Sequence, residues 1–315
     1  MASDLIAPSA RETRDLLSRA RRFAGRARRR LQAMVSSPNW EWSIGIYGGP
    51  SPLAMQPLMQ RPAVTRRDVR DFPADIVADP FMVRSDGRWW MFFEIWGKRT
   101  DRGVIGVASS ADALSWTYER VVLDEPFHLS YPHVFAWNGG YYMTPESFEA
   151  KSVRLYRADN FPWRWSHVAT LLEGEVLLDP TIFEHNGRWW MFVETNPQHR
   201  WDTLRLFHSD RPDGGWREHP RSPVIMGNPH HARPGGSVVV WDGRPVRLAQ
   251  DCAPDYGMRV HAFAIEEITA TEYRERPFGI VLDAGQLGWN RAGMHHLDAK
   301  PDGAGGWIAC VDGRR

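Results

Sequence analysis

The sequence is poor in cysteine and has no long hydrophobic run, and both absences exclude classes of protein. Its 315 residues include two cysteines, Cys252 and Cys310, which are too few for a disulfide framework or a zinc ribbon. No segment approaches the roughly 20 apolar residues of a membrane-spanning helix. The first thirty residues lack the apolar stretch of a secretory signal. These features predict a cytoplasmic protein.

Motifs for nucleotide, ester and metal chemistry are absent as well. The chain contains no P-loop, no GxGxxG fingerprint and no GxSxG elbow, which disfavours NTPases, Rossmann enzymes and serine hydrolases. It has no HExxH or CxxC spacing, so its motifs predict no metal and no other cofactor. Paired histidines occur at 230–231 and 295–296. Because neighbours on a strand face opposite sides, each pair is expected to offer one ligand to a site.

Charges of the two signs nearly balance but are unevenly placed. The formal net charge is +1, whereas residues 1–38 hold nine arginines against three acids, a balance of +6 that leaves −5 for the rest. An acidic body argues against a nucleic acid partner. In residues 11–33, apolar side chains recur at helical spacing among the arginines. Residues 1–37 are therefore interpreted as a basic amphipathic arm with a short helix.

Such an arm fits the anionic inner face of a membrane, where arginines are attracted to the surface charge. The protein would then be cytoplasmic with peripheral membrane contact. The alternatives are a solvated arm and an arm that docks on a partner protein.

The sequence is rich in glycine and tryptophan, with 27 and 16 residues. Five segments share the plan of an apolar strand, an Asn-Gly or Asp-Gly turn and a second strand. Their turn glycines are Gly87, Gly139, Gly187, Gly243 and Gly303. Two further short strands fit into each interval, and repeated four-stranded units are the blades of a β-propeller. The sequence predicts an all-β, five-bladed propeller over residues 38–315, with a β-sandwich as the alternative.

The fifth repeat reaches the last residue of the chain, Arg315, after two strands, so its outer strands must come from elsewhere. Residues 42–47 and 63–69 precede the first repeat and have the composition of spare strands. We therefore expect the N-terminal segment to close the ring by completing blade five, which protects edges that would otherwise aggregate.

Polar residues recur where the first strand of each blade begins, a position that faces the propeller axis. They are Asp79, Tyr131, Asp179, Arg233 and His296. Acids also follow or end the second strands, at Glu94, Glu146, Glu194, Asp251 and Asp312, with Gln250 beside Asp251. Two carboxyl groups in one pocket can act as general acid and base on a sugar. The alternative for each acid is to bind backbone amides of the blades.

Two motifs resemble the five-bladed glycosidase superfamily, in particular glycoside hydrolase family 43. They are VADPF around Asp79 and LLDPTIF around Asp179. The resemblance implies that Asp79 is the general base and that Asp179 tunes the acid and orients the substrate. It also implies a possible structural cation at the axis. The strings WSIGIYGGPSPL, ARPGG, AQDC and GWNRAGMHH more closely resemble the N-terminal domain of glucosamine inositolphosphorylceramide transferases.

One position departs from the family 43 pattern. Those hydrolases place a glutamic acid, their general acid, where this chain has Arg233. Because an arginine keeps its proton at neutral pH, it cannot protonate a leaving oxygen, but it can hold a phosphate or a carboxylate. Either Glu146 or Glu194 is the acid, or the leaving group is a phosphate that needs no proton. An ion pair of Arg233 with Asp79 or Asp179 is the structural alternative.

Together these features predict a carbohydrate-active enzyme that transfers a glycosyl unit to a glycan or lipid-linked acceptor in the axial pocket. Its donor would be a sugar phosphate or a nucleotide sugar. The predicted catalytic residues are Asp79, Asp179, Glu146 and Glu194, and the predicted substrate-binding residues are Arg233, His133, His296, Asp251 and Trp90. A family 43-like glycoside hydrolase and a non-catalytic glycan-binding or assembly module are the alternatives.

Overall fold

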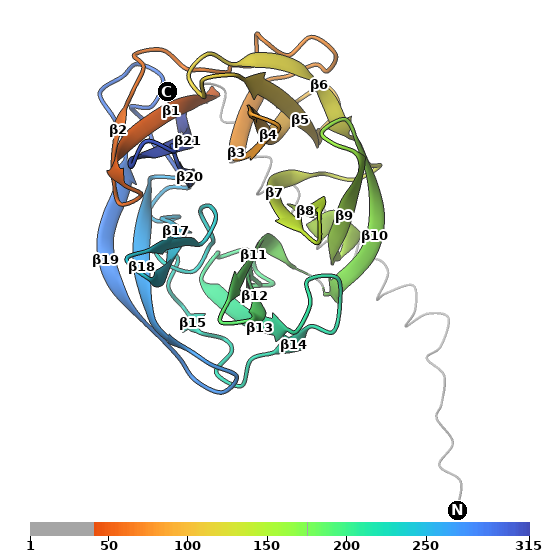
Figure 1. The fold of residues 1–315 in the computed structure, drawn as a ribbon, viewed down its shortest axis with the longest axis vertical. Helices are drawn as coiled ribbons and strands as arrows, with labels where there is room; N and C mark the ends of the chain where they lie inside the picture. Colours follow the sequence, from red (N-terminus) through yellow and green to blue (C-terminus); the bar gives the residue numbers. More distant parts are fainter. Residues whose placement is uncertain (1–40, 175) are drawn as a thin grey trace, which may run out of the picture. The chain divides into compact units, whose positions relative to one another are not determined.

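Five antiparallel sheets form a ring of blades in the computed structural model, which describes residues 41–174 and 176–315 (Figure 1). Strands β3, β7, β11 and β20 lie nearest the axis of the ring. The all-β, five-bladed propeller predicted from the repeats is therefore confirmed. The helix and arm predicted for residues 1–37 lie outside the described residues.

Each blade is a meander of four strands, with one extra short strand in blade 3. Blade 1 consists of β3 (Ile76–Ser85), β4 (Arg88–Gly97), β5 (Arg102–Ser110) and β6 (Thr117–Leu123). Blade 2 consists of β7 (Ser130–Trp137), β8 (Gly140–Glu146), β9 (Ser152–Asn160) and β10 (Arg164–Glu173), with the 3-10 turn η1 (Phe148–Ala150) between β8 and β9.

Blade 3 consists of β11 (Leu178–His185), β12 (Arg188–Glu194), β13 (Thr203–Ser209), β14 (Arg217–Glu218) and β15 (Ile225–Met226). Blade 4 consists of β16 (Val239–Trp241), β17 (Arg244–Gln250), β18 (Arg259–Ile268) and β19 (Tyr273–Asp283). Blade 5 consists of β20 (Leu297–Pro301), β21 (Trp307–Arg314), β1 (Trp42–Ser51) and β2 (Ala54–Pro57), in order from the axis outwards.

The hairpin turns follow the sequence signal in four blades. In each, the Asp or Asn and the Gly after it both have positive φ, for example 50° at Asp86 and 76° at Gly87, as a type I′ turn requires. The fifth turn differs, because Asp302 is not in the left-handed region and its carboxylate accepts N–H bonds from Ala304 and Gly306 at 2.7 and 2.9 Å. The Asp side chain there organises a wider loop.

The N-terminal segment closes the ring, as the sequence predicted. Strand β1 pairs antiparallel with β21 from Trp42↔Arg314 to Gly49↔Trp307, and β2 pairs with the outer edge of β1. The predicted second strand at 63–69 is wrong, because only Val64 bridges to β1, at Ile44. The pairing with β1 stops at Val64 because the Asp68 carboxylate accepts the Thr65 N–H at 2.8 Å, and this contact turns the chain.

The core is divided into five apolar layers, one between each pair of neighbouring blades. Phe92 of blade 1, for example, is fully buried against Phe161 and Trp165 of blade 2. Burial of a side chain of this size contributes about 1.5–3 kcal/mol. Both cysteines are buried and unpaired. Within the described ranges, no helix is long and apolar enough to span a membrane.

Candidate active site at the propeller axis

The first strands of blades 1, 2 and 3 share an unusual backbone conformation at the axis. Asp79, Tyr131 and Asp179 have φ values of 53°, 46° and 49°, each at a register shift of its strand pair. A left-handed conformation is costly for these residue types and concentrates at functional sites. A proline follows each one and donates no ladder hydrogen bond, so it tolerates the bulge.

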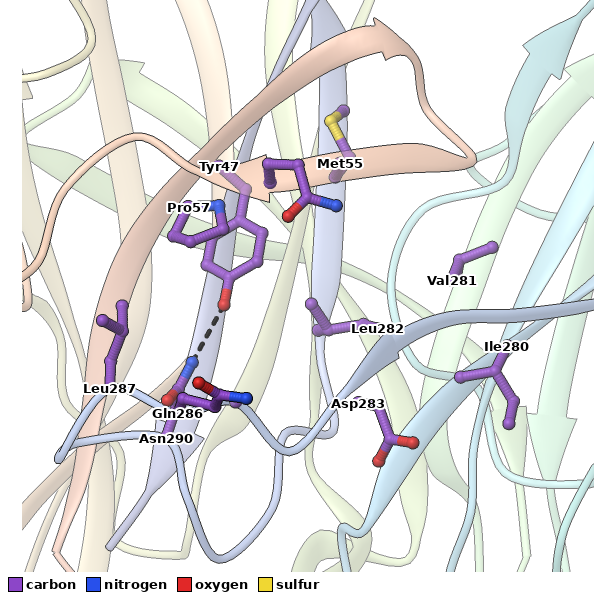
Figure 2. A pocket seen from close by; sticks show the side chains of 12 residues that line it. Tyr47, Met55, Pro57, Ile280, Val281, Leu282, Asp283, Gln286, Leu287 and Asn290 are labelled. Carbon is purple, nitrogen blue, oxygen red and sulfur yellow. Dashed lines mark hydrogen bonds between the residues drawn. The ribbon is translucent and has the colours of Figure 1, made fainter.

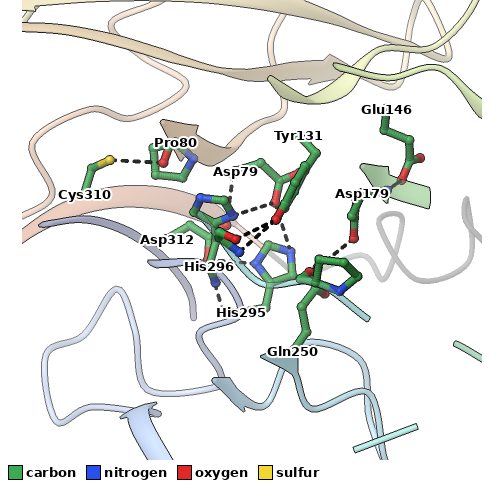
Figure 3. Close-up of polar contacts among 12 residues, drawn as sticks. Asp79, Pro80, Tyr131, Glu146, Asp179, Gln250, His295, His296, Cys310 and Asp312 are labelled. Carbon is green, nitrogen blue, oxygen red and sulfur yellow. Dashed lines mark hydrogen bonds and ion pairs between the residues drawn. The ribbon is translucent and has the colours of Figure 1, made fainter. Parts of the chain in front are cut away.

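Acids from a neighbouring blade hold two of these bulges. The Asp312 Oδ2 of blade 5 accepts the backbone N–H of Asp79 at 3.0 Å, and the Glu146 Oε2 of blade 2 accepts that of Asp179 at 3.2 Å. Figure 3 shows both contacts. Glu146 and Asp312 therefore bind backbone amides, which was the structural alternative for the second-strand acids.

Arg233 is paired with the acids predicted to surround it. Its Nε donates to Asp179 Oδ2 at 2.5 Å, and its Nη2 lies 3.6 Å from Glu146 Oε2. Gln250 also donates to Asp179 Oδ2, at 2.9 Å. The guanidinium lies 5.2 Å from the Tyr256 ring. The ion pair with Asp179 is thus present, and only Nη1 of Arg233 is buried without a partner.

Asp79 faces two imidazoles across short gaps. Its Oδ1 lies 3.8 Å from His295 Nε2 and 3.8 Å from His296 Nδ1, and it has no hydrogen-bond partner. These separations are too long for direct hydrogen bonds. Burial, and then the charges of Glu94, Asp312 and Asp179, raise the pKa of the Asp79 carboxyl well above its usual range. Asp79 therefore holds a proton at higher pH than an ordinary aspartate does.

His133 and His296 lie at the axis, where they contact the ring of Phe81 edge-on at centroid distances of 5.2 and 4.5 Å. Burial lowers the pKa of His133 to about 3 and that of His296 to about 4. Both side chains are therefore neutral at pH 7. They offer hydrogen bonds to a ligand but no positive charge to attract an anion.

Glu194, like Asp79, is a buried carboxyl with one oxygen that has no hydrogen-bond partner. Its Oε1 accepts N–H bonds from Asn196 and Thr203 at 2.9 and 3.4 Å, whereas its Oε2 has no partner. Burial raises the pKa of Glu194 to about 8. Since Glu146 is engaged with the Asp179 backbone, Glu194 is the better-placed of the two predicted proton donors.

Three other residues from the sequence patterns have their contacts elsewhere, although the charge of Glu94 still acts on Asp79. Glu94 pairs with His128 Nε2 at 3.3 Å. Asp251 binds His230 Nδ1 at 2.8 Å and His261 Nε2 at 3.3 Å, on blade 4. The structure does not bring Trp90 to the axis, because its ring packs on Phe161 and Trp163 between blades 1 and 2.

The sequence patterns missed His295, Trp42 and Tyr256. The expectation that one histidine of each pair can face a site is wrong for 295–296, because both lie within 3.8 Å of Asp79 Oδ1. They precede β20 rather than lie in it, so strand alternation does not apply to them. The strings GWNRAGMHH and WSIGIYGGPSPL contain His295 and Trp42, but nothing in the sequence showed that Trp42 and Tyr256 reach His295 from distant segments.

The acids and histidines at the axis could also form a metal site. Among residues 41–174 and 176–315, ligand atoms of Asp79, His295 and Asp312 lie within 4.8 Å of one another. The Asp312 oxygens, however, already accept four N–H bonds, from Asp79 N, His295 N, His296 N and His295 Nδ1, at 2.8–3.2 Å. A carboxylate this fully satisfied does not fit a metal ligand, so Asp312 acts here as a hydrogen-bond acceptor.

A cavity of about 350 Å³ lies away from the axis, between β2 and the end of β19 (Figure 2). Apolar side chains such as Met55, Ile280 and Leu287 line it, and the Asn290 amide donates to the Tyr47 hydroxyl at 2.9 Å. Its lining contains a single carboxylate, Asp283. This cavity lacks paired acids, so the axial group is the candidate active site.

The fold defines the class of protein, a five-bladed β-propeller, and solved glycoside hydrolases have a similar fold. The catalytic domain of the family 62 α-L-arabinofuranosidase from Coprinopsis cinerea superposes with a TM-score of 0.56 at 13% identity, covering 85% of this chain and 96% of that one. At that identity the likeness shows the fold alone.

Residues 36–314 match the family described as glucosamine inositolphosphorylceramide transferase 1, N-terminal, and the chain belongs to that family. It is 34% identical over 298 residues to glucosamine inositolphosphorylceramide transferase 1 of Oryza sativa subsp. japonica, covering 87% of this chain and 40% of the relative. The protein of the same name from Arabidopsis thaliana is 34% identical over 303 residues, covering 87% and 39%. The chain thus spans about two fifths of the length of these relatives.

Proposed function

We propose that this domain transfers a glycosyl unit to a hydroxyl acceptor in the axial pocket. One observation carries the proposal: Asp79 and Glu194 are buried carboxyls that each keep an unpartnered oxygen. The charges of Arg233 and Asp179 act on both of them. Two carboxyls around one site can move protons in opposite directions during glycosyl chemistry.

The roles follow from what each side chain touches. Asp79 binds the attacking hydroxyl and takes part in removing its proton. Glu194 holds its proton at neutral pH, because its pKa is raised to about 8, and gives it to a leaving oxygen. Asp179, fixed by Arg233 and Gln250, orients the sugar.

Two features favour transfer over hydrolysis. Arg233 stands where the family 43 pattern has its general acid, and its free Nη1 can donate to a phosphate oxygen of a sugar-phosphate or nucleotide-sugar donor. The relatives are named as transferases of glucosamine to a ceramide-linked acceptor, which supports a glycan or lipid-linked acceptor. We further propose that the domain is cytoplasmic and that residues 11–33 bring it into peripheral contact with an anionic membrane.

A glycoside hydrolase is the second candidate. Glu194 favours it, because its raised pKa of about 8 keeps it protonated at neutral pH and cleavage of an ordinary glycoside needs a proton donor. In that case the attacking hydroxyl belongs to water, and the same residues keep their roles.

A thermal-shift screen followed by product analysis tests the proposal. Nucleotide sugars, sugar phosphates and nitrophenyl glycosides are each added alone, because a bound ligand raises the melting temperature by mass action. Ligands that stabilise the protein are then incubated with and without a glycan acceptor. Transfer predicts product only when donor and acceptor are both present. Reducing sugar released with water alone supports the hydrolase, and saturable binding without turnover supports a glycan-binding module.

A further inference from the structure

His295 was assigned no role by the sequence patterns, yet it occupies the most constrained position beside Asp79. Its Nδ1 lies 2.8 Å from Asp312 Oδ1. Burial acts to raise the pKa of Asp312, but the neighbouring His295 and its hydrogen bond outweigh this effect and lower it. Because an ionised carboxylate only accepts hydrogen bonds, the ring hydrogen of His295 is on Nδ1. The Nε2 atom, which faces Asp79, therefore carries a lone pair in the neutral imidazole.

Two aromatic rings also pack on the ring of His295. Trp42 stacks on it at a centroid distance of 4.2 Å and an interplanar angle of 25°, and Tyr256 meets it edge-on at 5.1 Å. The Arg314 guanidinium lies 5.7 Å from the Trp42 ring. The titratable or charged groups around His295 are thus Asp79, Asp312, His296, Tyr256 and Arg314. A ring clamped in one orientation is what proton transfer requires.

The gap between Asp79 Oδ1 and His295 Nε2 has the size of a bridging hydroxyl. The two atoms are 3.8 Å apart, and an oxygen set to one side of the line between them can be within hydrogen-bond reach of both. Burial and acidic neighbours raise the pKa of Asp79, so its carboxyl binds a proton more readily than an ordinary aspartate does. The imidazole of His295 places a second proton acceptor beside it.

We propose that His295, oriented by Asp312, is the catalytic proton acceptor that acts together with Asp79 on the attacking hydroxyl. This rests on the proposed glycosyl chemistry. The hydroxyl O–H bond breaks and its proton goes to Nε2, and the oxygen forms a bond to the anomeric carbon. The bond from that carbon to the leaving oxygen breaks with its electron pair, and the leaving oxygen takes the proton of Glu194 or departs as a phosphate. Asp312 stabilises the imidazolium through Nδ1–H.

Nitrogen NMR of the ring tests the arrangement without any substrate. In the ¹⁵N-labelled full chain, we expect the neutral His295 ring to carry its hydrogen on Nδ1. Asp79→Asn is expected to change the Nε2 signal, and Asp312→Asn to produce a mixture of the two tautomers. A hydrogen on Nε2 in the wild-type protein, or an Nε2 signal indifferent to Asp79→Asn, overturns the proposal.

Kinetics test the chemical role on whichever donor, from the nucleotide sugars, sugar phosphates or nitrophenyl glycosides named above, gives turnover. His295→Asn is expected to lower kcat by on the order of 10²-fold with little change in KM, and Asp312→Asn to lower kcat less. His167→Asn, on the exposed face of β10, is the matched control and is expected to have no effect. A His295→Asn variant that melts like wild type and keeps its kcat contradicts the inference and leaves the transferase proposal standing. If no compound in the screen binds or turns over, the transferase proposal fails, while the NMR result still decides the role of His295.

Discussion

At the scale of single residues, Asp79 is the position on which the proposed chemistry depends most. We expect Asp79→Asn to lower turnover by on the order of 10²-fold or more, because the amide cannot accept a proton. The fold should survive, since the backbone N–H that Asp312 holds remains in place and Asn tolerates the left-handed conformation. Steady-state kinetics and a melting curve measure the two effects. Full activity in a variant that melts like wild type would show that Asp79 is not the base.

The raised pKa of Glu194 predicts how the stability of the protein changes with pH. Its pKa is raised from 4.5 to about 8 on folding, so between these values the folded state binds a proton that the unfolded state has lost. The contribution to stability is complete below pH 4.5 and is lost as the pH rises towards 8. Glu194→Gln cannot ionise. Its melting temperature relative to wild type should therefore rise by at least about 3 °C between pH 5 and pH 8.

A matched control is Glu218→Gln, on the exposed strand β14, where the neighbouring Arg205 lowers the pKa instead. The melting temperature of this variant relative to wild type should not rise between pH 5 and pH 8. Parallel melting curves for Glu194→Gln and wild type across that range would mean that Glu194 is ionised in the folded protein and cannot serve as the proton donor.

Axial residues could be predicted from the sequence where they occupy the same position in several repeats. Asp79, Asp179 and Arg233 were found because the blades repeat, and repeated positions meet at the axis. Which oxygens stay unpartnered could not be read this way, since it depends on contacts between blades, such as Glu146 with the Asp179 backbone. His295 escaped because it precedes β20, outside the repeated strands, and because its partner Trp42 is brought to it only by closure of the ring.

At the scale of elements, the hairpins and the outer strands of blades 1 to 4 were predictable, whereas the outermost strand of blade 5 was not. The turn at Asn186-Gly187, with φ values of 53° and 70°, needs only its own two residues. The fourth strand of blade 5 was misplaced because Ala54–Pro57 has no alternating pattern. It is held as a strand by pairing with Tyr47–Ser51 of β1.

Strand β1 also connects the closure of the ring to the site, which makes a deletion informative. Removing residues 1–36 should leave folding intact, whereas removing residues 1–60 takes away β1 and β2 and exposes the edge of β21. The longer deletion also removes Trp42, which stacks on His295. Size-exclusion chromatography and melting curves of both shortened chains measure the outcome. A monomeric, cooperatively melting chain of residues 61–315 would contradict the closing role of β1.

At the scale of the whole molecule, the acidic propeller and the basic arm predict different partners. The arm carries a balance of +6 over residues 1–38, and each arginine near an anionic surface contributes about 1 kcal/mol of attraction, which salt weakens. We expect the full chain to sediment with vesicles that contain phosphatidylserine at low salt, and to be released at moderate salt. A chain shortened to residues 37–315 should stay in the supernatant, and vesicles of phosphatidylcholine alone are the control for surface charge. Equal sedimentation of the two chains, or none by the full chain at low salt, would reject the membrane role. The axial chemistry would be unaffected by that result, because every residue assigned to it lies in the propeller.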